Sequence, residues 1–276
     1  MTPPDQSLHP KITVVTVVRN AEETIETTLK SVLAQDYPNL EYIVVDGDSE
    51  DATPSIIQPY IDHIDRYVRE PDQGIYDAMN KASELASGVW ILYMNAGDRF
   101  YASNSLNQLT QALRSDADVI SAGVVEVLVD SLETRTFRRM PRPVEKIWYQ
   151  MPTSHQSTLV RLAVQQHYRF DTRYRWCADH DMLARLYRDG KKFMSENSLL
   201  CIFDCSSSGT HRNPYRYIQE RWQLSQGLVP LHQRLFRYGT EWVHCTIWGK
   251  VVGFIKPLLP NSTLLYLRRI RGTAGS

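Results

Sequence analysis

The first hundred residues alternate between nearly unbroken apolar runs and stretches with an apolar residue at every third or fourth position. Three apolar runs, rich in β-branched side chains, cover residues 11–18, 41–45 and 89–94. Runs of this kind indicate strands that are buried on both faces of a sheet. Residues 21–35 instead place their apolar side chains on one helical face, with acids in the first turn where the helix dipole favours them.

The same alternation continues as far as residue 94. The pattern predicts a turn and a helix start over 47–61, a third strand over 64–70, a polar turn at 71–74 and a helix over 75–86. Strands that alternate with helices predict a doubly wound parallel sheet. Because the crossovers between parallel strands are right-handed, the strands end at one edge of the sheet, where open α/β sheets bind their ligands.

The pattern changes after residue 98. Further helices are predicted over 105–115 and 177–190, and strands over 117–129, 157–161 and 192–203, with a hairpin return at 133–140. From Pro214 the chain becomes helical, aromatic and rich in arginine. We therefore expect a disordered N-terminus over 1–10, one α/β domain over 11–212 and a helical C-terminal extension over 213–276.

Three acidic residues, Asp46, Asp72 and Asp98, follow predicted strands. The last of them ends the sequence ILYMNAGD, in which an apolar strand runs straight into a carboxylate. A buried carboxylate without a partner is costly, so we place these acids at the rim of a cleft along the strand edge. Gly97 would let the backbone turn sharply there and let a ligand approach.

Composition narrows the function classes. The 276 residues carry 31 basic and 31 acidic side chains, so no overall field points to nucleic acid. The four cysteines lack paired CxxC spacing, which disfavours a zinc site and a disulfide framework. The N-terminus lacks the pattern of a signal peptide, and no stretch reaches the roughly 18 apolar residues of a membrane span. We expect a cytoplasmic protein with reduced thiols.

No glycine-rich phosphate loop follows the first predicted strand, where the sequence reads VRNAEET. A dinucleotide-binding Rossmann domain and a P-loop are therefore disfavoured. A parallel sheet without such a loop can hold a phosphorylated ligand through a divalent cation, with carboxylates on one side of the ion and phosphate oxygens on the other.

Three segments resemble the family 2 glycosyltransferases of GT-A type. They read TVVTVVRNAEETIETTLKSVLAQDYPNLEYIVVDGDSEDAT, EPDQGIYDAMNKASELASGVWILYMNAGDRF and CADHDMLARL, and they lie between residues 11 and 190. The likeness is to bacterial enzymes that build exopolysaccharide, O-antigen or glycolipid sugars. It implies a Rossmann-like, mostly parallel twisted sheet flanked by helices, a nucleotide-sugar donor and an acceptor hydroxyl.

The resemblance assigns a donor site residue by residue. The positions that it places at the nucleotide-sugar are Thr16, Asn20, Asp46, Asp72 and Asn95. Asp46 matches the family acid that hydrogen-bonds the base, and Asp72 matches the residue near the ribose and base. The alternative for both is an acid in a solvated turn, with Asp46 capping the next helix.

Asp98 matches the last acid of the family's DxD-type motif, which is the direct metal ligand. This chain departs from the fuller motif, because Asn95 and Gly97 replace acids often found there. One carboxylate and a substrate diphosphate can still hold Mg²⁺ or Mn²⁺, since these ions keep several waters and take phosphate oxygens as ligands. The alternative for Asp98 is a helix N-cap alone.

Asp179, in the sequence CADHDMLARL, aligns with the family's general base. Direct displacement at an anomeric carbon needs a base that takes the proton of the acceptor hydroxyl. Asp181 lies two positions further along the predicted helix and points another way, so we expect it to be an acid of the first turn or a salt-bridged one. His180 between them is expected to take no part.

Two histidines are further candidates for contact with the acceptor or the diphosphate. His155 and Gln156 form a pair that the family often has at this place, and the alternative is a buried, hydrogen-bonded histidine. His211 lies among serine and glycine residues, where it is either a ligand of the diphosphate or the cation, or an ordinary loop residue.

The C-terminal stretch over 248–272 mixes apolar residues with Lys256 and several arginines. It is too short and too broken to span a bilayer. It could lie in the membrane interface with its basic side toward anionic headgroups, which would suit a lipid-linked acceptor. The alternative is a helical cap that packs on the main domain.

The sequence thus predicts an inverting glycosyltransferase that acts on a lipid-linked glycan at the inner face of the cytoplasmic membrane. UDP is the favoured nucleotide, with GDP and dTDP open. One alternative is a non-catalytic partner that binds nucleotide or glycan in an assembly complex. Another is a nucleotidyltransferase, which would normally show a glycine- and basic-rich loop in place of RNAEE.

Overall fold

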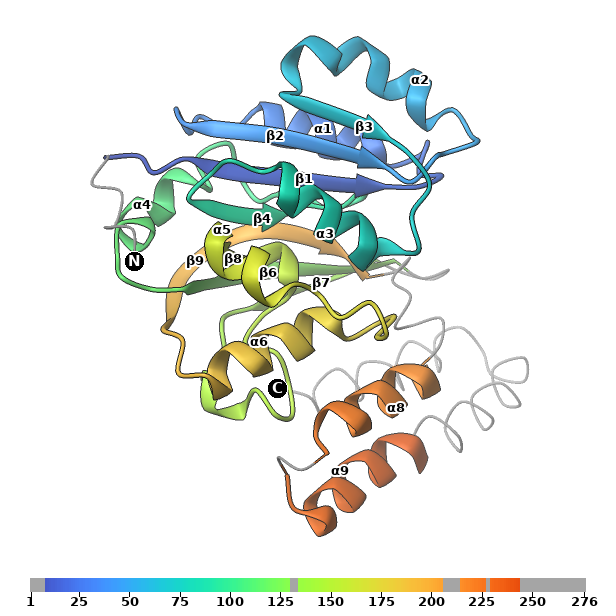
Figure 1. Ribbon diagram of the computed structural model, residues 1–276, viewed down its shortest axis with the longest axis vertical. Helices are drawn as coiled ribbons and strands as arrows, with labels where there is room; N and C mark the ends of the chain where they lie inside the picture. The colour runs from blue at the N-terminus through green and yellow to red at the C-terminus, as the bar shows by residue number, and fades with distance from the viewer. Residues whose placement is uncertain (1–7, 130–133, 206–213, 227–228, 244–276) are drawn as a thin grey trace.

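A twisted nine-stranded sheet with helices on both faces forms the centre of the protein (Figure 1). The computed structural model describes residues 8–129, 134–205, 214–226 and 229–243, and every count of strands and helices refers to these residues. The strand order is β3-β2-β1-β4-β8-β6-β9-β5, and β7 pairs with β6 outside this path. This arrangement confirms the predicted α/β class with a mostly parallel sheet.

The first four strands form a parallel half-sheet. They are β1 (Ile12–Val18), β2 (Leu40–Asp46), β3 (Arg66–Arg69) and β4 (Trp90–Tyr93). β1 pairs with β2 on one side and with β4 on the other, and β2 pairs with β3. The strand order therefore reverses at β1, and such a switch point opens a crevice beyond the ends of the strands.

The remaining strands form a mixed half-sheet. They are β5 (Arg99–Phe100), β6 (Val119–Val129), β7 (Thr134–Arg139), β8 (Thr158–Arg161) and β9 (Phe193–Asp204). β8 is antiparallel to both of its neighbours, β4 and β6, and β9 is parallel to β6. β6 and β9 consequently run in the same direction as β1–β4, so β9 ends at the same edge as β4.

Helices cover both faces of the sheet. The α-helices are α1 (Ile25–Leu33), α2 (Thr53–Ile57), α3 (Ile75–Leu85), α4 (Thr110–Leu113), α5 (Leu162–Tyr168), α6 (Ala178–Arg188), α8 (Pro214–Leu224) and α9 (Leu231–Val243). The 3₁₀ turns are η1 (Gln58–His63), η2 (Asn107–Leu109), η3 (Val144–Lys146) and η4 (His155–Ser157). The helix predicted over 105–115 is shorter than expected, because its first turn is the 3₁₀ turn η2.

Two apolar clusters lie on opposite faces of the sheet. One joins alternate residues of β1, such as Val14 and Val18, to α1, α2 and α4. The other joins Val15 and Val17 to α3, α5 and α6, the helices drawn in front of the sheet in Figure 1. Because side chains of a strand point alternately to either face, both faces of β1 are buried, as its unbroken apolar run predicts.

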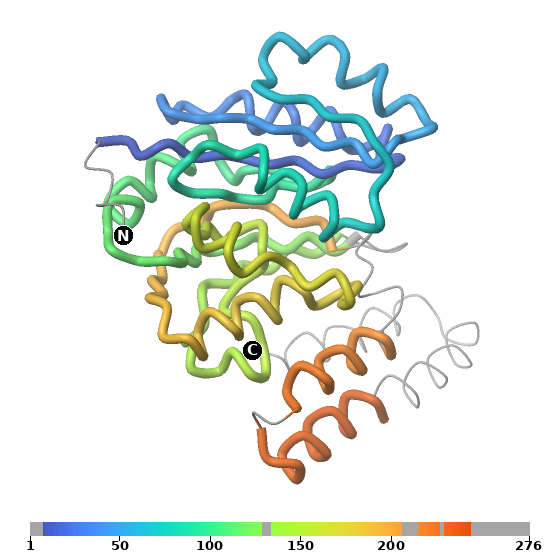
Figure 2. The backbone as a smooth tube through the Cα atoms, viewed as in Figure 1, coloured from blue at the N-terminus to red at the C-terminus, as the bar shows by residue number. Residues whose placement is uncertain are grey.

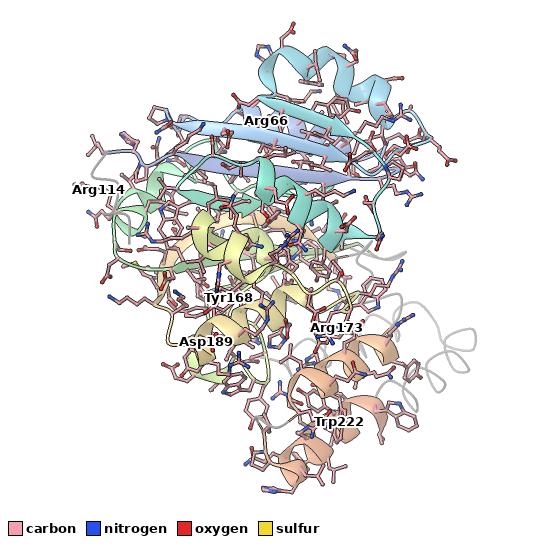
Figure 3. All side chains as sticks on the ribbon, viewed as in Figure 1. Arg66, Arg114, Tyr168, Arg173, Asp189 and Trp222 are labelled. Carbon is pink, nitrogen blue, oxygen red and sulfur yellow. The ribbon has the colours of Figure 1, made fainter. Side chains whose placement is uncertain are left out.

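The helices α8 and α9 lie side by side next to α6, at the end of the described chain (Figure 2). Trp222 of α8, labelled in Figure 3, lies 5.9 Å from the ring of Tyr238 and 4.0 Å from the guanidinium of Arg234, both in α9. Within the described residues, the helical character predicted beyond residue 213 is confirmed. The predicted domain boundary stays a prediction.

The two ends of the chain fall partly outside the described residues. Residues 1–7, which belong to the predicted disordered N-terminus, lie outside them, as does the stretch 248–272. The carbonyl groups of His9 and Pro10 accept hydrogen bonds from Asn39 and Tyr37, so these two residues of the predicted disordered stretch are bonded to the domain. None of the helices in the described ranges is long and apolar enough to cross a membrane.

Candidate active site

The predicted site residues follow the ends of neighbouring parallel strands. Asp46, the last residue of β2, lies opposite Val18, the last residue of β1. Beyond β4, the backbone N–H of Ala96 donates to the carbonyl group of Val17, so the loop with Asn95 continues along β1. The ends of β2, β1 and β4 therefore form one continuous edge, as the alternating pattern predicts.

Asp46 is fully buried and is held by its own loop. Its Oδ1 accepts hydrogen bonds from the backbone N–H of Ser49 at 2.8 Å and from the Ser49 hydroxyl at 2.6 Å. The hydroxyl of Tyr67 in β3 donates to Oδ2 at 3.3 Å. Burial raises the pKa of Tyr67 to about 12, and the negative charge of Asp46 adds to this effect. Asp46 is therefore a positioned carboxylate and not an acid in a solvated turn.

Asp72 packs against the loop that follows Asp46. A Cβ atom at Gly47 would lie 2.0 Å from Oδ2 of Asp72, so a larger residue there would force the Asp72 carboxylate to move. The other oxygen, Oδ1, accepts the backbone N–H of Gly74 at 2.8 Å. The structure thus brings Asp46 and Asp72 into adjacent loops, and their contact with a nucleotide stays a prediction.

Thr16 and Asn20 have structural contacts. The hydroxyl of Thr16 is fully buried, pairs with the Tyr42 hydroxyl at 2.9 Å and donates to the carbonyl group of Met94 at 2.8 Å. Asn20 has a φ of 50°, and its side-chain oxygen accepts the backbone N–H of Glu50 at 2.9 Å. These bonds shape the loops after β1 and β2, and they lend no support to a direct contact of the Thr16 hydroxyl with the nucleotide.

Asp98 is a buried carboxylate with a raised pKa. It is 5% exposed, and Gly97 before it has a φ of 100°, which confirms the predicted sharp turn. Burial raises the pKa of Asp98 to about 7, and the negative charge of Asp204 at the end of β9 adds to the rise. His155 and a hydrogen bond from the side chain of Gln156 act in the opposite direction. Because the pKa of Asp98 lies near neutral pH, a nearby cation would stabilise its ionised form.

Oxygen atoms near Asp98 fit a hard divalent cation. Oδ1 of Asn95 and Oε1 of Gln156 are buried, and neither has a hydrogen-bond partner among the described residues. Both residues lie close enough to the Asp98 carboxylate to lower its pKa, Asn95 through its backbone and Gln156 through its side chain. Carboxylate and amide oxygens are the ligands that Mg²⁺ and Mn²⁺ prefer. Within the described ranges, no group of three or more His, Cys, Asp or Glu side chains forms a complete metal site, so a diphosphate would have to supply the remaining ligands.

His155 joins the loop of Asp98 to Asp179. Its Nε2 lies 3.0 Å from Nδ2 of Asn95, and its Nδ1 lies 3.2 Å from Oδ2 of Asp179. An amide nitrogen only donates, so Nε2 accepts and Nδ1 carries the proton that it donates to Asp179. His155 therefore lies between the loop of Asp98 and Asp179, and its role beside the acceptor or the diphosphate stays a prediction.

Asp179 is buried, yet it stays ionised. Its Oδ1 accepts the Tyr76 hydroxyl at 3.0 Å and the backbone N–H of His180 at 2.8 Å. Burial by itself would raise the pKa of Asp179, but the hydrogen bonds from His155 and from the backbone N–H of His180 outweigh it and lower the pKa. The side chain of Asp179 is 12% exposed, and its carboxylate is available as a proton acceptor at neutral pH.

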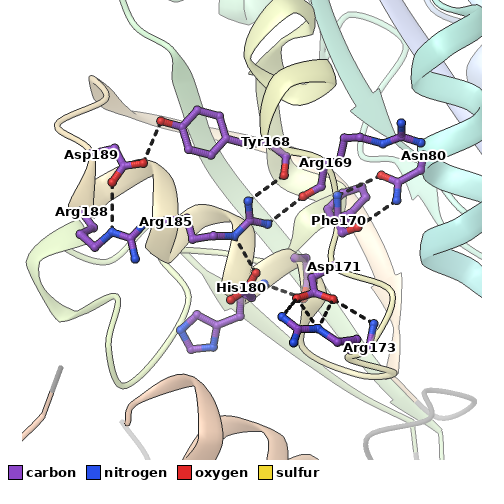
Figure 4. A network of polar contacts seen from close by, with 12 residues as sticks. Asn80, Tyr168, Arg169, Phe170, Asp171, Arg173, His180, Arg185, Arg188 and Asp189 are labelled. Carbon is purple, nitrogen blue, oxygen red and sulfur yellow. Dashed lines mark hydrogen bonds and ion pairs between the residues drawn. The ribbon is translucent and has the colours of Figure 1, made fainter. Parts of the chain in front are cut away.

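The residues next to Asp179 have other tasks. Asp181 forms an ion pair with Arg185 at 2.8 Å, which confirms the expectation of a salt-bridged acid. Arg185 also donates to the carbonyl groups of Tyr168 and Arg169, both at 2.7 Å, and thereby ties α6 to the end of α5 (Figure 4).

His180 bonds the carbonyl group of Ile147, and burial lowers its pKa to about 4. Its imidazole therefore stays neutral and contacts Ile147, whereas its backbone N–H contacts Asp179.

Several residues of the site escaped the sequence analysis. Asp204 carried the same signal as Asp98, an acid at the end of an apolar run, in the sequence LLCIFD. Tyr67 and Tyr76 carried no signal, because their tasks arise from hydrogen bonds to Asp46 and Asp179. His211 lies outside the described residues, and its role stays a prediction.

The chain resembles known proteins in sequence. The family model described as Glycosyl transferase family 2 matches residues 13–188, more than half of the chain. A PGL/p-HBAD biosynthesis glycosyltransferase of Mycobacterium bovis is 32% identical over 100 residues. That alignment covers 35% of this chain and 39% of the relative, so the chain matches about two fifths of the relative's length.

Two solved structures share the fold. TarS of S. aureus in complex with UDP-GlcNAc has a TM-score of 0.62 at 16% identity, over 86% of this chain and 73% of TarS. The mannosyltransferase PcManGT from Pyrobaculum calidifontis, in complex with GDP-Man and Mn²⁺, has a TM-score of 0.63 at 18% identity, over 99% of this chain and 82% of that protein.

The chain belongs to glycosyl transferase family 2. This confirms the resemblance on which the prediction was based, as well as the GT-A type of fold. By family, the protein is an enzyme of the glycosyltransferase class.

Proposed function

We propose that the protein moves a sugar from a nucleotide-diphosphate sugar to an acceptor hydroxyl, with inversion at the anomeric carbon. The observation that carries this proposal is the ionised, buried Asp179 in contact with His155, at the same edge as Asp46 and Asp98. A module that only bound nucleotide or glycan would need no such base. The arrangement therefore favours an enzyme over a non-catalytic assembly partner.

In the proposed reaction Asp179 acts as the general base. Its carboxylate takes the proton of the acceptor hydroxyl while the hydroxyl oxygen attacks the anomeric carbon. The new bond between that carbon and the acceptor oxygen forms as the bond to the diphosphate oxygen breaks, and the nucleoside diphosphate leaves. The N–H of His155 holds the carboxylate in place during this step. A single displacement of this kind inverts the configuration.

The donor would lie along the ends of β1, β2 and β4. We assign the base and ribose to Asp46 and Asp72, and the diphosphate to the loop of Asn95 and Asp98. Asp98 and the amide oxygens near it would hold Mn²⁺ or Mg²⁺, and the bound ion supplies charge stabilisation to the leaving diphosphate. The Mn²⁺ in the PcManGT complex supports this assignment.

The nucleotide that we propose is UDP, as in the complex of TarS with UDP-GlcNAc. The GDP-Man complex of PcManGT shares the fold equally well, so GDP stays open, as does dTDP. The acceptor that we propose is a lipid-linked glycan in cell-surface polysaccharide synthesis, reached at the inner face of the cytoplasmic membrane.

Exposed apolar side chains of α9 support a membrane contact. Leu235, Phe236 and Trp242 are 57%, 76% and 53% exposed, although side chains of this size are usually covered. The basic and apolar stretch that suggested this contact, 248–272, follows α9 but lies outside the described residues. We expect the full chain to co-sediment with anionic liposomes, and the variant Leu235→Ser/Phe236→Ser to co-sediment less. Equal sedimentation of the two would contradict a contact through α9.

A panel of UDP-, GDP- and dTDP-sugars, assayed for slow hydrolysis with and without Mn²⁺, tests the proposed activity without knowledge of the acceptor. We expect Mn²⁺-dependent hydrolysis of a UDP-sugar by the wild-type chain. In Mn²⁺, the variant Asp98→Asn should bind that donor at least about 10-fold more weakly than the wild type does. In EDTA, the variant and the wild type should bind the donor equally weakly. Equal donor affinity of the two proteins in Mn²⁺ would contradict the metal role. A retained anomer in the transfer product would contradict direct displacement.

A further inference from the structure

A residue of α8 holds the segment that leads into α6. Glu220 is 7% exposed, and its carboxylate accepts three consecutive backbone N–H groups. These belong to Arg175 at 3.0 Å, Trp176 at 2.8 Å and Cys177 at 3.1 Å. Consecutive N–H groups that converge on one carboxylate form an anion-binding nest, and hydrogen bonds to a charged group are stronger than neutral ones. Glu220 therefore fixes the backbone immediately before α6.

This contact stands in for a local helix cap. The N-terminal N–H groups of a helix are commonly satisfied by the side chain of the N-cap residue. The N-cap of α6 is Cys177, and its side chain makes no capping hydrogen bond. The backbone at the entrance to α6 is instead tied to a residue 43 positions further along the chain. Since Asp179 is the second residue of α6, the path of residues 175–177 decides where its carboxylate lies.

The neighbour of Glu220 anchors α8 itself. Arg221 donates to Glu241 of α9 at 2.8 Å and to the carbonyl group of Tyr149. Its guanidinium lies 5.3 Å from the ring centres of Tyr217 and Tyr238. These contacts join α8 to α9 and to the loop after η3. Because the carbonyl group of Tyr149 and the two rings hold Arg221 as well, the position of α8, from which Glu220 extends, does not depend on Glu241 alone.

We propose that Glu220 is a positioning residue for the transfer step and acts through the backbone of residues 175–177 on Asp179. This inference rests on the proposed function, because it assumes that Asp179 is the base. Loss of the carboxylate would free three N–H groups and let the start of α6 move away from His155. A misplacement of about 1 Å at a reacting group can lower a rate about 100-fold. Donor binding involves Asp46 and Asp98 on other elements, and it should be spared.

The variant Glu220→Gln removes the charge and one accepting oxygen, and Glu241→Gln is the matched control. The control makes the same chemical change in the same helical pair, but Glu241 contacts Arg221 and not residues 175–177. Three quantities are measured well below the melting temperature: hydrogen exchange of the amides of residues 175–181, donor affinity, and the transfer rate at saturating donor. For Glu220→Gln we expect exchange about 10- to 100-fold faster, transfer about 10- to 100-fold slower and donor affinity within about twofold. Glu241→Gln should leave exchange and transfer near wild type.

Two results would overturn the inference. Wild-type exchange of residues 175–177 in Glu220→Gln would show that the carboxylate does not hold this segment, and this readout needs no activity from any variant. A parallel loss of donor affinity and transfer would show that Glu220 serves stability alone. An absence of transfer by the wild-type chain with every donor would instead count against the proposed function. If Glu220→Gln does not fold, Glu220→Asp, which withdraws the charge by one methylene, should give the same selective changes at smaller size.

Discussion

Two buried carboxylates, one in each half of the sheet edge, differ in what surrounds them. Asp98 follows β4 in the parallel half, and burial raises its pKa to about 7 because its hydrogen bonds do not compensate. Asp179 lies in α6 beside the mixed half, and the donors around it lower its pKa although it is buried as well. Burial alone therefore does not determine the charge of an acid in this protein. The hydrogen-bond donors aimed at the carboxylate decide whether it is ionised, and each setting suits the proposed task of the acid.

The strongest test of this contrast removes the charge of Asp179. We expect Asp179→Asn to slow transfer by about 10²- to 10⁴-fold, the range of general-base catalysis, and to leave donor affinity within about twofold. Asp181→Asn is the matched control on the same helix, and it should stay within about threefold of wild type because it removes only the ion pair with Arg185. Single-turnover rates and donor titrations measure both quantities. A loss of donor affinity in Asp179→Asn would place Asp179 in the donor site.

The two acids should also affect stability with opposite signs. In metal-free protein the pKa of Asp98 rises from 3.8 to about 7, so its favourable contribution is complete below pH 4 and is lost as the pH rises through 7. A pKa difference of about 3 corresponds to at most about 4 kcal/mol. Asp179 has a lowered pKa, so its contribution is present at neutral pH and is lost only as the pH falls below the ordinary carboxyl range.

Melting temperatures in EDTA at pH 5 and pH 8 measure this difference. Asp98→Asn should be more stable than wild type at pH 8, and by a smaller margin at pH 5, where Asp98 has lost its proton in the unfolded wild-type chain but keeps it in the folded one. Asp179→Asn should be less stable than wild type at both pH values. The same sign for the two variants at pH 8 would refute the comparison.

A smaller effect is expected at His155, which contacts both halves. His155→Ala removes the N–H that Asp179 accepts and should slow transfer by about 10- to 100-fold, the cost of a lost hydrogen bond to a buried charge. His155→Asn can still donate from its amide nitrogen, so we expect it to recover part of the rate. Transfer rates at saturating donor decide between them. Equal rates for the two variants would mean that this N–H contributes nothing to the base.

The smallest expected effects compare two tyrosines that have the same task in different halves. Tyr76→Phe removes a donor from Asp179, and Tyr67→Phe removes a donor from Asp46. A single hydrogen bond contributes about 0.5–1.5 kcal/mol, so we expect changes of about 2- to 10-fold. Tyr76→Phe should act on the transfer rate and Tyr67→Phe on donor affinity. The two variants serve as controls for each other, and an exchange of their effects would reverse the assignment of donor and base sites.

Much of the parallel half could be predicted from local pattern. The apolar runs located β1, β2 and β4, the helical spacing located α3, and the acids after the runs identified Asp46 and Asp98. The glycine before Asp98 indicated the turn that its positive φ confirms. The mixed half was harder to predict from local pattern. The antiparallel course of β8 has no local signature, and Asp204 was overlooked although it ends an apolar run.

What the sequence determined by itself is the order of strands and helices, and hence which residues reach the strand edge. Periodicity, turn residues and apolar runs act over a few positions, so a single segment contains all of this information. Only the tertiary structure decided the protonation state of each buried acid. Tyr76 and Asp179 are 103 positions apart, and Glu220 and Cys177 are 43 apart. Such contacts depend on how whole helices pack, and the electrostatic setting of a buried carboxylate comes from whichever donors that packing brings to it.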